Sequence, residues 1–205
     1  AMDKSYGPPE GLKQFVEAAH NRGIAVLLDV VYNHITSQSP LSQLYGSNVE
    51  NPFIEPGPTE DPDADRGFCD DFFQELNHGS PFIKRYIDRA NEYWIEEYNV
   101  DGFRFDLAKC VADDGLPIGD PNYTDAVTSG WKNAADHVWD TVDEDTYMIL
   151  EFFGSPGVEN ELGGYRDNDG DTGSMMTWHN MNPRYSQADM GFSENSSVSD
   201  SYYGN

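Results

Sequence analysis

Hydrophobic residues along the first part of the chain follow a helical pattern and then an extended one. From Pro9 to Ala19 the apolar positions recur at helical spacing, and Gly23 follows as a stop signal. Residues 24–32 are almost all aliphatic or β-branched, which predicts a strand covered on both faces, as in a parallel sheet. A helix followed by a buried strand is the repeating unit of an α/β fold.

The same helix–strand pattern occurs twice more. Ser80 and Pro81 are typical of a helix start, and residues 100–107 then resemble a strand. A third helix is expected over 124–142, followed by a strand over 147–152. Three such repeats predict a parallel sheet. The apolar face expected on the second helix consists of Ile83, Tyr86, Ile87, Ala90, Trp94 and Tyr98.

The chain divides into three parts by composition. Segment 33–79 is rich in Pro, Gly, Ser and Asp and is far longer than the roughly 2–6 residues of an ordinary connection in such folds. We therefore expect a sheet segment over 1–32, an inserted lobe over 33–79 that carries part of any binding site, and a second sheet segment over 80–205. Beyond residue 154 the chain is dominated by Gly, Asp, Asn and Ser, and only 175–190 is expected to be ordered and partly helical.

Composition excludes several classes of partner. The chain of 205 residues has 12 Lys and Arg against 37 Asp and Glu, a formal charge of −25, which disfavours binding to nucleic acid or to anionic membrane surfaces. No apolar run approaches the roughly 20 residues of a membrane-spanning helix, so no membrane insertion is expected. Cys69 and Cys110 permit at most one disulfide, which leaves the redox compartment open.

Charged residues within the second predicted strand indicate a functional site. Residues 102–107 alternate, so Phe103 and Phe105 are expected on one face while Arg104 and Asp106 share the other. Enclosing two opposite charges is costly unless they pair, and proteins often tolerate that cost at a site. A purely structural ion pair is the alternative interpretation.

Polar residues also follow the other two predicted strands. The first strand leads into His34, and Glu151 lies at the end of the third. Alone, His34 is more often a structural histidine, and Glu151 a solvated strand end. Because ligands of parallel α/β folds bind at the carboxyl ends of the strands, three such ends together favour a site.

The residues around these strand ends resemble a known family. Segments 29–34 (DVVYNH), 102–109 (GFRFDLAK) and 149–154 (ILEFFG), with 76–78 (LNH) before the second helix, are similar to motifs of the α-amylase superfamily, glycoside hydrolase family thirteen, in particular its bacterial amylase-like members. The resemblance implies a (β/α)8 TIM barrel, of which this chain would hold strands three to five, with a long lobe inserted after the third strand. It implies cleavage of α-1,4-glucosidic bonds in starch-like glucans by double displacement with retention.

The resemblance also implies roles for single residues. Asp106 matches the nucleophile, Glu151 the general acid/base, and Arg104 a residue that orients the nucleophile. His34 matches a residue that hydrogen-bonds the sugar at the cleaved bond, and Lys109 lies near the subsite of the leaving group. Independently of the family, the ring of Tyr32, beside the inserted lobe, offers a flat surface for a sugar; the aromatic residues of this region could equally form a small core.

One departure from the family limits the chain. The family's third catalytic carboxylate is an aspartate that follows a histidine, and no histidine of this sequence is followed by aspartate. We therefore expect a central portion of a larger enzyme that is weakly active or inactive alone. The alternatives are a transglycosylase or branching enzyme, which shares these motifs, and a non-catalytic carbohydrate-binding protein.

Calcium is the cofactor that the resemblance implies. Family members hold a structural calcium through the residue matching Asn33, lobe aspartates and a backbone carbonyl, here that of Cys110. The acidic segments 61–65 and 167–171 present oxygen ligands at alternate positions, but neither completes an EF-hand, and solvated loops are the favoured interpretation. The acidic composition suggests a salty habitat, and we expect a secreted, periplasmic or cell-surface location. Composition leaves the oligomeric state open.

Overall fold

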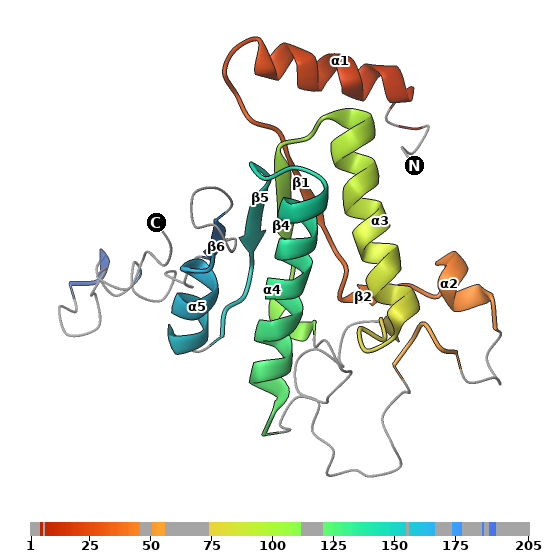
Figure 1. Cartoon of the computed structure of the whole chain (residues 1–205), viewed down its shortest axis with the longest axis vertical. Coiled ribbons are helices and arrows are strands. Elements are labelled where there is room, and N and C mark those ends of the chain that lie inside the picture. Colours follow the sequence, from red (N-terminus) through yellow and green to blue (C-terminus); the bar gives the residue numbers. More distant parts are fainter. Residues whose placement is uncertain are drawn as a thin grey trace.

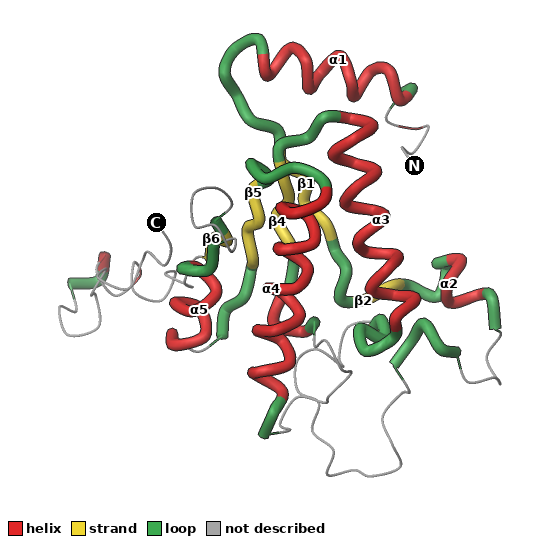
Figure 2. The backbone as a smooth tube through the Cα atoms, in the orientation of Figure 1, coloured by secondary structure: helices red, strands yellow, loops and turns green. Residues whose placement is uncertain are grey.

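The computed structural model describes residues 5, 7–45, 51–55, 74–111, 121–154, 156–166, 174–177, 186 and 189–191. Within this part, strands form a parallel sheet and helices lie on one of its faces (Figures 1 and 2). The elements are α1 (Pro9–His20), β1 (Leu27–Val30), β2 (His34–Ile35), α2 (Pro40–Gln43), β3 (Gln74–Glu75), α3 (Pro81–Tyr98), β4 (Gly102–Phe105), a 3₁₀ turn (Ala108–Cys110), α4 (Tyr123–Thr141), β5 (Tyr147–Leu150), α5 (Pro156–Gly163) and β6 (Met175–Thr177).

The four-stranded sheet has the order β1-β4-β5-β6, and each neighbouring pair is parallel. The three predicted helix–strand repeats and their parallel pairing are thereby confirmed. Strand β6 and helix α5 were not predicted. Segment 175–190, which contains β6, was expected to be partly helical, and α5 lies in a segment rich in glycine and aspartate. Met175–Thr177 is too short for its own periodicity to reveal a strand, and its pairing with β5 decides its conformation.

The core lies between the sheet and helices α3, α4 and α5. Phe103 and Phe105 of β4 share one face, as predicted, and both are fully buried there; Trp131 of α4 packs against Phe105 with ring centroids 4.8 Å apart. Burial of each such side chain stabilises the fold by about 1.5–3 kcal/mol. Further fully buried side chains come from β5, β6 and the helices: Met148, Leu150, Met175, Ala135, Val138 and Leu162.

Strand β1 is less buried than its sequence predicts. Leu28 and Val30 pack against the core, but Leu27 is 38% exposed, and Ile24 and Val31 beside the strand are 56% and 46% exposed. The prediction of cover on both faces is wrong for the described residues, because β1 is an edge strand and helices cover one face of the sheet. An aliphatic run indicates a strand but does not reveal which layers cover it.

Helix α3 begins at Pro81 as predicted, but its buried face differs from the expected one. Ile83 and Tyr98 are buried, whereas Tyr86 is 50% exposed. Asn91, a polar residue outside the predicted face, is buried because its Oδ1 accepts a hydrogen bond of 3.0 Å from the Tyr32 hydroxyl. A hydrophobic pattern cannot register such a buried polar pair.

Strands β4 and β5 approach each other closely where they begin. A Cβ atom at Gly102 would lie 2.6 Å from Cβ and 2.7 Å from the backbone nitrogen of Tyr147. Any side chain at this position would force the two strands apart, so glycine is required by the close approach.

The described part of segment 33–79 contains a short antiparallel pair, β2 with β3, and the helix α2. Leu76 N–H donates to the Asn33 carbonyl at 2.9 Å, which joins the end of the segment to its start. The division into three parts stays a prediction, because 46–50 and 56–73 lie outside the described residues. Cys69 also lies outside them, while Cys110 is buried and disulfide-bonded. No helix in the described part is long and apolar enough to cross a membrane.

His78 fastens the end of this segment to the residues after β1. Its side chain is 4% exposed, and its Nε2 lies 2.8 Å from the Tyr32 carbonyl oxygen, to which it must donate. Burial lowers the pKa of His78 to about 4, although the hydrogen bond to Tyr32 acts in the opposite direction. The imidazole is therefore neutral in the folded chain near neutral pH.

We predict that acid destabilises the chain partly through His78. Its pKa falls from 6.5 in the unfolded chain to about 4 on folding, so the unfolded state takes up the proton first and stability is lost as the pH falls through this window. Relative to His78→Gln, the wild type should lose about 3 kcal/mol of unfolding free energy between pH 7 and pH 4. Urea unfolding of both proteins checks this, since the carboxylates common to both cancel in the comparison. A difference that does not vary with pH would contradict it.

Candidate active site

Three adjacent strands bring acidic and basic side chains to one edge of the sheet. Asp29 in β1 stands opposite Arg104 in β4, and Asp106 and Glu151 follow β4 and β5 directly. The backbone ladder continues past the strand ends, because Asp106 N–H donates to Val30 at 2.9 Å and Glu151 N–H to Phe105 at 3.0 Å. The backbone at both acids is therefore as firmly placed as the strands themselves.

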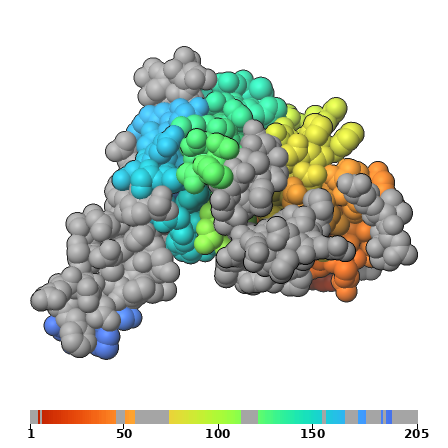
Figure 3. Space-filling view, turned by 90° about the horizontal axis from the view of Figure 1, so that it is seen from below, coloured from red at the N-terminus to blue at the C-terminus, as the bar shows by residue number. Residues whose placement is uncertain are grey.

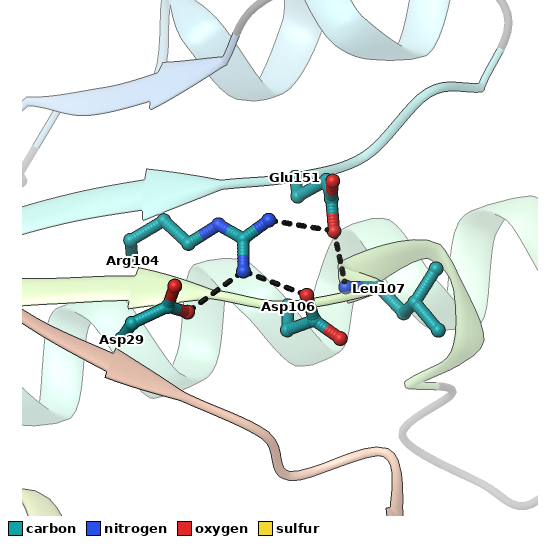
Figure 4. A network of polar contacts seen from close by, with 5 residues as sticks. All are labelled: Asp29, Arg104, Asp106, Leu107 and Glu151. Carbon is teal, nitrogen blue, oxygen red and sulfur yellow. Dashed lines mark hydrogen bonds and ion pairs between the residues drawn. The ribbon is translucent and has the colours of Figure 1, made fainter.

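The guanidinium of Arg104 contacts three carboxylates (Figure 4). Its Nη1 lies 2.7 Å from Asp29 Oδ1 and 2.6 Å from Asp106 Oδ1, and its Nη2 lies 2.8 Å from Glu151 Oε2. The prediction that Arg104 and Asp106 share one face is confirmed. Asp106 and Glu151 bind neighbouring nitrogens of one planar group, which holds the two carboxylates side by side.

The electrostatics of the cluster favour a permanent charge on Arg104. Burial by itself lowers the pKa of Arg104, but hydrogen bonds to Asp29 and Asp106 and the charge of Glu151 outweigh burial and raise it. Arg104, Asp106 and Glu151 side chains are 24%, 27% and 17% exposed, so water screens these contacts only in part. One cation facing three carboxylates leaves the cluster with excess negative charge.

Leu107 supplies a backbone contact that the sequence did not reveal. Its N–H donates to Glu151 Oε2 at 3.2 Å, the same oxygen that Arg104 contacts. Leu107 has φ +47°, a left-handed conformation that costs a residue with a Cβ about 1–2 kcal/mol. Strain of this kind persists where the surroundings hold it in place, and here it directs an amide at a carboxylate.

Asp29 was not predicted as a member of the site, although it contacts Arg104 directly. The signal that could have found it is strand register: pairing β1 with β4 in parallel places Asp29 beside Arg104 on the same face. Alternation within one strand identifies residues of one face, but only the pairing identifies neighbours on another strand.

His34 lies close enough to Asp106 to sense its charge. Burial lowers the pKa of His34, and the negative charge of Asp106 opposes this shift. His34 belongs to β2, where it stands opposite Glu75 in the antiparallel pair. The residues that follow β1 and β4 therefore lie close together, as predicted.

Lys109 lies in the 3₁₀ turn that follows β4, where its carbonyl accepts a hydrogen bond of 2.7 Å from Tyr123. This bond fixes the backbone of the turn just beyond Asp106. A role of Lys109 in binding substrate stays a prediction.

Tyr32 lies on the helix side of the sheet, which corrects the expectation that its ring faces a sugar. The ring packs 6.0 Å from the ring of Phe105, and its hydroxyl donates to Asn91 of α3. Burial, with a smaller contribution from Tyr86, raises the pKa of Tyr32. Phe105 and Arg104 are consecutive residues of one strand and point to opposite faces, so Tyr32 contributes to the core rather than to the acidic cluster.

Asn33 is the one predicted calcium ligand within the described residues that offers a side-chain oxygen. Its side chain is 2% exposed, and Oδ1 has no hydrogen-bond partner. Among the described residues, no group of three or more His, Cys, Asp or Glu could hold a metal ion. The acidic segments 61–65 and 167–171 lie outside them.

Paired carboxylates on adjacent parallel strands, held by one arginine, define an α/β protein with the layout of an acid–base site. Among curated proteins, the chain is 34% identical over 114 residues to malto-oligosyltrehalose trehalohydrolase of Saccharolobus solfataricus, covering 55% of this chain and 18% of that protein. It is 32% identical over 117 residues to the intracellular maltogenic amylase of Bacillus subtilis (54% and 20%) and 36% identical over 107 residues to the 1,4-alpha-glucan-branching enzyme of Equus caballus (52% and 14%).

Two solved structures share the fold. The α-amylase of Geobacillus thermoleovorans complexed with acarbose has a TM-score of 0.58 at 23% identity, over 82% of this chain and 34% of that one. An Anoxybacillus α-amylase has a TM-score of 0.60 at 20% identity, over 90% and 36%. No family model matches the chain. These relatives are α-amylase-family enzymes of glycoside hydrolase family thirteen, and this chain is similar to the curated ones over about half of its length. It matches only 14–20% of the length of the three curated relatives.

We predict that removing the cation of the cluster destabilises the chain. Arg104→Gln leaves Asp29, Asp106 and Glu151 facing one another without a positive charge, which should lower the unfolding free energy at pH 7 by about 2 kcal/mol.

The matched control for this prediction is Arg89→Gln. Arg89 pairs with Glu92 alone and its side chain is 70% exposed, so its loss should cost under about 0.5 kcal/mol. Denaturant unfolding of both variants at pH 7 provides the measurement. Equal losses in the two variants would show that the bridged cluster contributes no more than a surface pair.

Proposed function

We propose that the protein is a glucan-active glycoside hydrolase of α-amylase type that cleaves α-1,4-glucosidic bonds in starch-like glucans with retention. The observation that carries this proposal is the single guanidinium of Arg104 in contact with both Asp106 and Glu151 on neighbouring strands. Retaining enzymes need two carboxyl groups roughly 5–5.5 Å apart. Asp106 and Glu151 follow neighbouring parallel strands, which lie about 4.8 Å apart, and they contact adjacent nitrogens of one guanidinium. Both features are compatible with that separation.

In the proposed reaction, Asp106 attacks the anomeric carbon and forms a covalent glycosyl ester. Glu151 gives a proton to the departing glycosidic oxygen and then removes a proton from the water that hydrolyses the ester. Arg104 orients Asp106 through a charge-assisted hydrogen bond. Neutral His34 beside Asp106 is suited to hydrogen-bond a sugar hydroxyl without adding a charge.

Glu151 requires a change of contacts before it can act as an acid. Arg104 and the Leu107 N–H both contact its Oε2, so this oxygen is not available to the departing glycosidic oxygen. We propose that a bound glucan weakens the contact between Arg104 and Glu151 while Arg104 stays with Asp106. The other contacts of the guanidinium, with Asp29 and Asp106, would hold it during that change.

We also infer that the parallel sheet is a segment of a (β/α)8 barrel. The face opposite the helices carries Leu27 and Tyr147, which are 38% and 45% exposed, as well as the acidic cluster. A closed barrel would enclose such a face and remove the open edges of the sheet. The structural similarity to two α-amylases supports this inference. On it, β1, β4 and β5 correspond to strands three to five, and β6 adds a sixth.

We propose a structural calcium ion near Asn33. Its buried Oδ1 without a partner fits this ion, because calcium prefers amide, carbonyl and carboxylate oxygens and a buried polar atom otherwise lacks compensation. Asn33 would hold the ion, with the carbonyl of Cys110 as a second ligand. Calcium would then join the inserted segment to the sheet and take no part in bond cleavage.

The calcium proposal predicts a metal-dependent melting temperature. At a calcium concentration one hundred times the dissociation constant, the folded chain should gain about 2.7 kcal/mol. Thermal unfolding with calcium and with chelator should therefore give different midpoints, and Asn33→Ala should abolish the difference. Identical midpoints for the wild type under both conditions would rule the proposal out.

The catalytic proposal predicts different responses to the two acids when the leaving group is fluoride. Departure of fluoride from α-maltosyl fluoride needs no proton, so Glu151→Gln should release the first equivalent of fluoride about as fast as the wild type and then slow, because hydrolysis of the glycosyl ester lacks its base. Asp106→Asn should lower the first release at least about a hundredfold. On starch, both variants should be inactive. Because the third carboxylate of the family is absent from this sequence, wild-type turnover of starch by the chain alone should be weak.

Asp140→Asn, an exposed acid of α4, is the matched control and should behave as the wild type. Fluoride release that does not depend on Asp106 would contradict the proposed nucleophile. Transfer to a sugar acceptor is the second candidate activity, favoured by the similarity to a branching enzyme. Longer oligosaccharides formed when maltose is added would identify transfer, and glucan binding without any turnover would identify a non-catalytic binding protein.

A further inference from the structure

The turn that follows β4 holds Glu151 through hydrogen bonds from its backbone. Glu151 N–H donates to the Phe105 carbonyl at 3.0 Å, and the Glu151 carbonyl accepts from Ala108 N–H at 2.9 Å. Its side-chain Oε2 accepts from Leu107 N–H at 3.2 Å (Figure 4). Two successive amides of the turn, at 107 and 108, therefore contact both the carboxylate and the backbone of Glu151.

The conformation of this turn depends on its surroundings. Leu107 has φ +47° and ψ +43°, a left-handed conformation that is unfavourable for a residue with a Cβ. The 3₁₀ part of the turn, Ala108–Cys110, has only three residues, so it contains few hydrogen bonds of its own. Contacts from outside the turn are therefore needed to hold it in place.

Helix α4 supplies two such contacts. Trp131 is 3% exposed, and its indole N–H donates to the Ala108 carbonyl at 2.8 Å. The hydroxyl of Tyr123 donates to the next carbonyl, that of Lys109, at 2.7 Å. Without Trp131, the buried Ala108 carbonyl would keep the longer bond of 3.3 Å from Val111 N–H. Two side chains of one helix thus fix two consecutive carbonyls of the turn.

We propose that Trp131 is a positioning residue for the general acid/base, and that Tyr123 assists it. Both side chains hold the turn, and the turn holds Glu151 where it acts. This inference rests on the proposed function and deepens it. When a bound glucan weakens the contact between Arg104 and Glu151, the Leu107 N–H continues to hold the carboxylate.

Trp131 acts on the reaction through the turn and not through the substrate. Its ring lies on the helix side of the sheet, where it packs 4.8 Å from the ring of Phe105. The acidic cluster lies on the opposite face, because Arg104 and Phe105 are consecutive residues of one strand. Support of this kind matters for catalysis, because a displacement of about 1 Å caused far from the reacting atoms can lower a rate about a hundredfold.

The test compares Trp131→Phe with Trp139→Phe. Both tryptophans lie in α4 and are nearly fully buried, and Trp139 donates its indole N–H to the Thr146 carbonyl at 2.9 Å. Thr146 precedes β5, whereas Glu151 follows it, so the control bond lies at the other end of the strand. Both changes remove the same kind of bond and should lower the melting temperature by similar amounts. Only Trp131→Phe should affect Glu151.

We expect the two variants to differ in the release of fluoride from α-maltosyl fluoride. In Trp131→Phe, the first equivalent should be released within about twofold of the wild-type rate, because departure of fluoride needs no proton. The steady rate that follows is set by hydrolysis of the glycosyl ester. It should fall about tenfold, because a displaced Glu151 removes a proton from water less well. Trp139→Phe should keep both rates.

Added azide distinguishes a displaced base from a damaged site. Azide ion attacks the anomeric carbon of the glycosyl ester, forms maltosyl azide and releases the Asp106 carboxylate, and no proton has to be removed. Azide should therefore restore the steady rate of Trp131→Phe to within about threefold of the wild type. It should have little effect on Trp139→Phe.

Hydrogen exchange of the backbone amides tests the same inference without substrate. Exchange at 107 and 108 reports directly on the two bonds to Glu151. It should be at least about tenfold faster in Trp131→Phe than in Trp139→Phe, because the turn opens more often without the indole bond.

A second pair of variants applies if Trp131→Phe does not fold. Tyr123→Phe removes only a hydroxyl and should accelerate exchange at 107 and 108 about threefold. Tyr165→Phe is its control, because the Tyr165 hydroxyl donates to Asp136 of α4 at 2.9 Å and not to the turn. This control should exchange at these positions as the wild type does.

Equal exchange at 107 and 108 in the two tryptophan variants would overturn the inference. A lowered steady rate that azide does not restore would also overturn it, since the site would then be damaged rather than its base displaced. A wild type without fluoride release that depends on Asp106 would instead contradict the proposed function. Amide exchange would in that case still decide whether Trp131 holds the turn against Glu151.

Discussion

The contact of one guanidinium with three carboxylates is the interaction on which the rest of this structure depends. Arg104 draws Asp29, Asp106 and Glu151 from three adjacent strands to one point, in a chain whose formal charge is −25. Without that cation, acids at neighbouring strand ends would repel one another. The parallel pairing of the strands brings the three acids close together, and the positive charge of Arg104 compensates the repulsion between them. Fold and candidate chemistry are therefore joined through a single side chain.

Much of the sheet and part of the site could be predicted from the sequence, since both depend on short-range patterns. Alternation in 102–107 placed Arg104 and Asp106 on one face, and that placement is confirmed. Elements that depend on pairing were missed: β6 has three residues and takes its conformation from β5, and the contact of Asp29 with Arg104 follows from register between strands. Tyr32 was misplaced because its environment is set by Asn91, far away in the sequence.

The two faces of the sheet have different roles, one in packing and the other in the candidate chemistry. The helix side is closed by aromatic and aliphatic packing around Phe105, and Trp131 is fixed there by the hydrogen bond from its indole N–H to the Ala108 carbonyl. The other face carries the charges. Along β4, residues that pack in the core therefore alternate with residues that carry the charges of the candidate site. The expected habitat and the location outside the cytoplasm stay predictions, because no contact in the described part of the chain depends on them.

The close approach of β4 and β5 at Gly102 limits how the sequence of this strand can diverge. At the start of β4 the neighbouring backbone leaves no space for a larger residue, and two positions further on a positive charge is required. Variation along this strand is thus restricted by volume at one end and by charge towards the other. Substitutions, whether they arise naturally or in a directed library, will be tolerated mainly on the outer surfaces of the helices.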